Sequence, residues 1–84
     1  MKGTEAMPTV KNIGAHRFFF YSNEGEEPPH IHVKREICSA KFWLRPVSLV
    51  SSNGFKGAEL RNLEKMVTQN HTLFLEAWDA YFKS

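Results

Sequence analysis

The last third of the chain contains the longest segment with a helical pattern, and this limits how the rest can fold. Residues 56–83 contain no proline and one glycine. Strong helix formers fill the segment, and its apolar residues recur at the spacing of one helix face. We predict one continuous helix, with a break near Asn70 and His71 as the alternative because Asn caps helices well. The apolar stripe consists of Leu60, Leu63, Val67, Phe74, Trp78 and Tyr81.

The first 55 residues carry strand signals instead. Short runs of β-branched and aromatic residues are separated by Gly, Pro and Asn. A length of 84 residues leaves room for one domain. We predict an α+β fold in residues 7–84, with residues 1–6 as a flexible extension. Its sheet is mainly antiparallel with four or five strands, and the long or kinked helix lies on one face. The predicted strands are residues 9–13, 16–21, 30–34, 38–44 and a brief edge strand at 47–50, with a break at 51–54.

Composition and motifs indicate the cellular compartment and exclude several classes of enzyme. Cys38 is the single cysteine, so no internal disulfide forms and a reducing cytoplasm is expected. No apolar run approaches the roughly 20 residues of a membrane span, and the N-terminus lacks a secretory pattern. The net charge of +2 does not by itself indicate nucleic acid. The motifs of phosphate-binding loops, nucleophile elbows and metalloprotease helices do not occur.

Strand alternation sorts the side chains into two faces. Residues two apart on a strand share a face, so the apolar sets must face the core. A single helical layer covers one face of a sheet, which predicts that the other face is bare. The bare face would combine cations and aromatic rings, and such a surface suits a protein partner, a second copy of the chain or single-stranded RNA. Its expected residues are Arg17, Phe19, Tyr21, His30, His32, Lys34, Lys41, Trp43 and Arg45.

His30 and His32 are the strongest candidates for chemistry. Two imidazoles near neutral pH can act as acid and base on an RNA phosphodiester, which would make the chain a metal-independent ribonuclease. Lys34 or Arg35 would then stabilise the charged transition state. The alternative is that both histidines are partly exposed strand residues that form hydrogen bonds with the Glu-rich loop of residues 24–27. His16 and His71 have no motif around them and are expected to be structural.

A metal site is a further alternative for the same two histidines. A His-x-His pair on one strand face places two imidazoles close enough to share an ion. A third ligand is open among Glu24, Glu26, Glu27 and Cys38, although alternation places Cys38 on the core face. The pattern does not complete a ligand set, so the sequence predicts no cofactor and no assigned metal ligands.

Several segments resemble a bacterial family known as domain-of-unknown-function family 4160. They are residues 7–10, 17–24, 27–33 and 40–44, and the run Pro29-His30-Ile31-His32-Val33 is the most specific. The family's genes often lie beside those of another small family. The resemblance therefore implies a toxin–antitoxin-type module in which this chain is the toxin-like member and binds a small antitoxin-like protein. It assigns no catalytic residue. A non-enzymatic interaction module, which dimerises or inhibits a larger complex, is the competing class.

Overall fold

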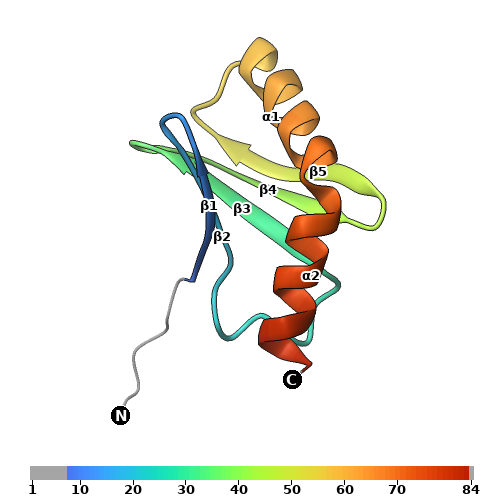
Figure 1. Ribbon diagram of the computed structural model, residues 1–84. Coiled ribbons are helices and arrows are strands. Elements are labelled where there is room, and N and C mark those ends of the chain that lie inside the picture. The colour runs from blue at the N-terminus through green and yellow to red at the C-terminus, as the bar shows by residue number, and fades with distance from the viewer. Residues whose placement is uncertain (1–7, 84) are drawn as a thin grey trace.

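The computed structural model describes residues 8–83, so the extension predicted at residues 1–6 lies outside the described part. An antiparallel sheet of five strands precedes two helices, which confirms the α+β prediction. Strand order in the sheet follows chain order, as in a simple meander (Figure 1). The elements are β1 (Thr9–Ile13), β2 (His16–Phe19), β3 (His30–Arg35), β4 (Cys38–Leu44), β5 (Val47–Asn53), α1 (Gly57–Gln69) and α2 (His71–Phe82).

The C-terminal segment forms two helices that lie on one face of the sheet (Figure 1). The favoured prediction of one continuous helix is wrong, and the break occurs at Asn70. The Asn70 side chain donates a hydrogen bond to the carbonyl of Met66 at 2.8 Å. Asn side chains compete in this way with a continuous helical ladder. Within residues 8–83, neither helix has the length and apolar character that a membrane span requires.

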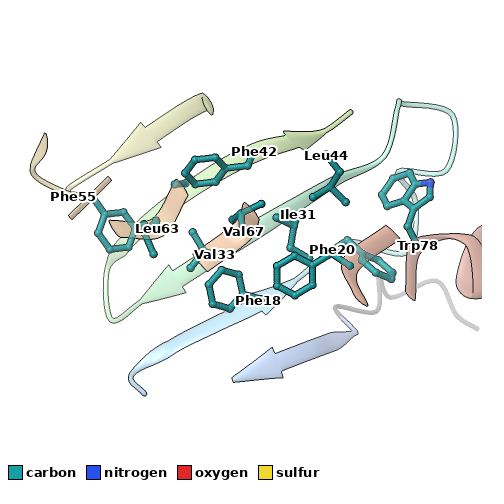
Figure 2. Close-up of a cluster of buried hydrophobic side chains, with 12 residues drawn as sticks. Phe18, Phe20, Ile31, Val33, Phe42, Leu44, Phe55, Leu63, Val67 and Trp78 are labelled. Atoms are coloured by element: carbon teal, nitrogen blue, oxygen red, sulfur yellow. The ribbon is translucent and has the colours of Figure 1, made fainter. Parts of the chain in front are cut away.

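The core lies between the helices and one face of the sheet. Figure 2 shows the apolar side chains of the strands against those of the helices, with Trp78 at one end of the cluster. Four of the six residues of the predicted helix stripe are buried, whereas Leu60 is partly buried and Tyr81 remains 43% exposed. The buried members are Phe18, Phe20, Ile31, Val33, Ala40, Phe42, Leu44, Phe55, Leu63, Val67, Phe74 and Trp78.

The fifth strand is longer than predicted. It continues to Asn53 because Ser52 and Asn53 pair with Ala40 and Ser39 of β4, which offers a ladder of seven residues. Polar serines do not prevent pairing at a sheet edge that faces water. The chain leaves the sheet one residue later, at Gly54, whose φ of 93° is costly for other residues. The second strand is shorter than predicted and ends at Phe19.

The face opposite the helices is only partly bare, which corrects the prediction. The chain between β2 and β3 folds back beside the last turns of α2 (Figure 1), where Gly25 packs closely against the Phe82 ring. His30 is 0% exposed, and its ring lies 4.8 Å from that of Trp78. Phe19 is 3% exposed under neighbouring side chains. Alternation assigned the correct face to both residues, but tertiary contacts cover them.

Candidate metal centre

His30 is a fully buried histidine with a fixed tautomer. Its Nδ1 lies 2.9 Å from the carbonyl oxygen of Pro28. A carbonyl oxygen only accepts hydrogen bonds, so Nδ1 carries the proton and donates it. In a neutral imidazole, the other nitrogen, Nε2, then presents a lone pair. Metal-binding histidines are commonly held in this manner, because the second bond fixes the ring and its tautomer.

The lone pair of His30 faces a carboxylate. Nε2 lies 2.9 Å from Oε1 of Glu24, yet this buried nitrogen has no hydrogen-bond partner among the described residues. The 2.9 Å separation fits either a shared proton or an ion that bonds to both atoms. Two donors bonded at about 2.1 Å to one ion, at right angles, lie about 3 Å apart, and the ion sits off the line between them. The separation of these two atoms fits that arrangement.

His32 contacts the same carboxylate from the neighbouring position on the strand face. Its Nε2 lies 2.9 Å from Oε2 and 3.1 Å from Oε1 of Glu24. The ring stacks on Phe19 at 5.4 Å and meets the edge of Tyr21 at 4.9 Å, which restricts its rotation. Burial lowers the pKa of His32, and the hydrogen bond and charge of Glu24 oppose this effect without cancelling it. The imidazole is therefore mainly neutral at pH 7, the form that binds metals.

Glu24 is held as an ionised group between the two imidazoles. The backbone N–H of Tyr21 donates to Oε1 at 3.0 Å and fixes the carboxylate from the loop side. Burial raises the pKa of Glu24, but the backbone hydrogen bond from Tyr21 and the contacts with His32 and His30 outweigh it and leave the pKa below its usual value. The ligand atoms of Glu24, His30 and His32 all lie within 4.8 Å of one another. We call these three residues the His-Glu-His cluster.

Surrounding contacts hold the cluster in place. The His30 ring packs between Trp78 of α2 and Trp43 of β4, with ring centroids at 4.8 and 5.8 Å. Glu27, in the loop before β3, forms an ion pair with Lys41 at 2.7 Å and so fastens the loop to β4. The cluster is thus supported by the sheet, the loop and α2 together. Such support keeps ligand atoms converged before an ion binds.

The other predicted ligands lie elsewhere. Cys38 pairs with Arg35 at the far end of the β3–β4 hairpin. Its sulfur lies where a side chain on Gly54 would be, 2.9 Å from that position. Glu27 reaches Nδ1 of His30 only at 3.9 Å, on the side of the ring opposite the cluster. Glu24, one of the four open choices, lies 2.9 Å from a ring nitrogen of each histidine.

The predicted binding residues divide into two groups. Arg35 does not join the outer face, because its side chain pairs with Glu59 and lies 5.5 Å from the Phe55 ring on the helix side. Arg45 is exposed in the β4–β5 turn. The remainder stay with His32 on the face opposite the helices, which we call the outer face: Arg17, Phe19, Tyr21, Lys34, Lys41 and Trp43. His30 lies at the end of this face, where Trp78 of α2 covers its ring.

A pocket lies on this outer face beside the His-Glu-His cluster. Its volume is about 480 Å³, a size that suits a small molecule. Ile37, at the tip of the β3–β4 hairpin, is 91% exposed at its rim. Sequence reasoning missed Ile37, although its place beside a turn residue was a usable signal. The pocket is lined by Phe19, Tyr21, His32, Lys34, Glu36, Ile37, Ser39 and Ala40.

The other two histidines occupy positions away from the cluster. His71 Nε2 bonds to the carbonyl oxygen of Leu44 and links the start of α2 to β4. His16 packs against Phe55 with ring centroids 6.1 Å apart. Both contacts agree with the structural role expected for them.

Comparison with known proteins gives a family without an assigned activity. A family model described as Domain of unknown function (DUF4160) matches residues 16–79, which include all three residues of the His-Glu-His cluster. No curated protein and no solved structure shows significant similarity to the chain. The match covers most of the sequence and agrees with the resemblance seen in its motifs. The chain therefore belongs to the family described as Domain of unknown function (DUF4160).

Proposed function

We propose that this chain binds one divalent transition-metal ion through Glu24, His30 and His32. The lone pair of His30 Nε2 is the observation that carries the proposal. It lies inside the protein, 2.9 Å from a carboxylate oxygen, while the opposite ring nitrogen donates to a carbonyl. Two acceptors facing each other in a low-dielectric site repel, and a cation between them replaces this repulsion with two bonds.

The donor set selects the class of metal. Two imidazoles and one carboxylate suit Zn(II), Fe(II), Ni(II) or Cu(II), and this set also occurs in catalytic zinc and non-haem iron sites. Mg(II) and Ca(II) prefer oxygen ligands and are disfavoured here. Binding needs the lone pair of His32 Nε2, so the single proton of the neutral ring would move to Nδ1 and leave the ring a neutral ligand.

A proton is the competing occupant of the site. If His30 were an imidazolium, its Nε2–H would donate to Glu24 in a buried ion pair. The 2.9 Å separation between His30 Nε2 and Glu24 Oε1 fits both occupants. Metal titration distinguishes them, because only the metal site binds a stoichiometric ion.

Metal titration tests the proposal. Protein stripped with a chelator is titrated with Zn(II) by calorimetry, and we expect saturation at one ion per chain. Glu24→Gln and His32→Gln each remove a ligand and weaken Zn(II) binding by more than about a hundredfold. His16→Gln is the matched control, since His16 packs against Phe55 away from the cluster. The proposal fails if the folded protein binds no ion, or if both cluster variants bind as tightly as the control.

A second candidate function is binding of a small antitoxin-like protein, and of RNA, by a toxin-like member of a two-component module. It is supported by Ile37, which is 91% exposed, and by the exposed Lys34 nearby on the outer face. Large exposed apolar groups commonly mark protein interfaces, and cations track phosphates. The acid–base role of His30 and His32 in RNA cleavage stays a prediction, and the full burial of His30 leaves only His32 with surface toward solvent.

Expression in a bacterial host separates this second function from simple metal binding. A toxin-like chain arrests growth, and Ile37→Ser or Lys34→Ala relieves the arrest if the outer face makes the contact. His30→Ala with His32→Ala abolishes the arrest if it depends on the histidines, with folding verified by circular dichroism. RNA binding that weakens steeply with added salt supports a phosphate contact. Normal growth together with no RNA binding would refute the second function.

A further inference from the structure

The proposed metal ion would keep coordination positions that the described residues do not fill. Three protein ligands leave a transition-metal ion with at least one open position, which is the arrangement of catalytic rather than structural sites. Two of the three ligands retain some contact with solvent: the side chain of Glu24 is 13% exposed and that of His32 is 17% exposed. A small ligand therefore has a route to the ion from the outer face.

The pocket beside His32 is built from residues that touch the ligands. His32 itself lines it. Tyr21 also lines it, and the same residue holds Glu24 through its backbone N–H at 3.0 Å and contacts the His32 ring at 4.9 Å. The wall of the pocket and the cluster thus share side chains. A molecule seated in the pocket lies next to the metal position.

The charge of this region favours an anion. A divalent ion with one carboxylate ligand has a net charge of about +1. Lys34 lines the pocket, and its ammonium group makes no hydrogen bond or ion pair with the residues described in the structure. Lys34 lies two residues from His32 on the same strand face, about 7 Å along the strand. One phosphate or carboxylate group is able to bridge the ion and the Lys34 ammonium. Among residues 8–83, Glu36 is the single acidic residue that lines the pocket.

Apolar side chains also line the pocket. Tyr21 is half-buried, and Ile37 is 91% exposed at the rim, so both have surface to cover. Ligand pockets commonly combine apolar walls with a few convergent polar groups. These two side chains therefore suit the apolar body of a small molecule whose anionic end meets the ion.

We propose, on the basis of the metal centre inferred above, that the pocket binds a small oxyanion with an apolar body. Its phosphate or carboxylate group coordinates the ion and pairs with Lys34, and its apolar part covers Tyr21 and Ile37. The chain would then bind two ligands side by side. The first is the metal ion, and the second is an anionic substrate or effector that coordinates it.

Cobalt spectroscopy tests this inference on the full chain. Co(II) is loaded at the cluster, and its visible absorption is followed as inorganic phosphate, acetate, phenyl phosphate or benzoate is added. We expect a saturable change of the Co(II) spectrum. Comparison of the two phosphates with the two carboxylates shows which kind of anionic group the site prefers. The aromatic members should bind about tenfold more tightly than the simple anions, because each buries additional apolar surface.

Two exposed positions provide variants that leave the fold and the ligands in place. Lys34→Ala weakens every anion by about fivefold or more while Co(II) affinity stays unchanged. Ile37→Ser removes the preference for the aromatic anions alone. Lys65→Ala, on the exposed surface of α1, is the matched control and changes neither.

The outcomes distinguish this inference from the proposed function. If Co(II) binds at one ion per chain but its spectrum ignores all four anions, the pocket inference is wrong and the metal site is a closed one. Equal anion affinities for the Lys34→Ala and Lys65→Ala variants would also overturn it. If Co(II) does not bind, the metal proposal itself fails and the pocket inference falls with it.

Discussion

At the scale of single residues, His30 and Glu24 show how one hydrogen bond changes the chemistry of a side chain. Without the bond from Nδ1 to Pro28, either ring nitrogen of His30 would be free to hold the proton. With it, the proton is fixed on Nδ1, and the lone pair of Nε2 points at Glu24. A hydrogen bond to a backbone carbonyl thus prepares a buried nitrogen for a cation.

Glu59 provides a residue-scale prediction away from the cluster. The backbone N–H of Lys56 donates to its carboxylate, and together with the Arg35 guanidinium it holds the pKa of Glu59 below its ordinary value of 4.5. A lowered pKa in the folded state stabilises the fold above the unfolded pKa, and this contribution is lost as pH falls through the folded pKa. We expect Glu59→Gln to lower the melting temperature at pH 7.

The dependence on pH is the sharper part of this prediction. The difference in melting temperature between Glu59→Gln and the original chain should narrow steadily as pH falls below 4.5. Glu76→Gln, on the exposed surface of α2, serves as the control. A difference that stays constant from pH 7 to pH 3 would show that the charge of Glu59 is not responsible.

At the scale of elements, the two helices on either side of Asn70 contact different parts of the sheet. α1 contacts β4 and β5, while α2 contacts β3 and β4. α2 carries Trp78, whose ring lies 4.8 Å from that of His30. The second helix therefore supplies one wall of the His-Glu-His cluster.

Asn70→Ala tests whether the Asn70 side chain causes the break between α1 and α2. The substitution removes the bond from the side chain to the Met66 carbonyl and the contact with Lys11, at 2.8 and 3.2 Å. We expect a loss of about 1 kcal/mol in the free energy of unfolding, measured by denaturant titration. Helical circular dichroism should stay unchanged, because packing on the sheet fixes both helices. A rise in helicity with no loss of stability would mean that Asn70 alone imposes the break.

At the scale of the whole molecule, local patterns predicted the sheet but not the burial of His30 at the start of β3. Alternation along β3 and β4 correctly separated Ile31 and Val33 from His30 and His32, because side chains on a strand change face at every residue. Burial of His30 involves Trp78, which is 48 positions later in the chain. No local pattern contains that contact. For the same reason, the sequence alone does not determine which of the loop carboxylates lies beside the two histidines.

The His-Glu-His cluster fastens the β2–β3 loop to β3 beside Trp78 of α2, so its ion should stabilise the whole fold. Glu24 lies in the β2–β3 loop and His30 and His32 lie in β3, while Trp78 of α2 covers His30. An ion that binds only the folded chain stabilises it in proportion to the logarithm of its concentration. At a free Zn(II) concentration 100 times the dissociation constant, we expect a gain of about 2.7 kcal/mol in the free energy of unfolding. Denaturant titration with and without Zn(II) measures this gain, and a chelator should abolish it. Glu24→Gln should show no response to the ion, whereas His16→Gln should respond as the original chain does. An equal gain in Glu24→Gln would place the stabilising ion elsewhere on the molecule.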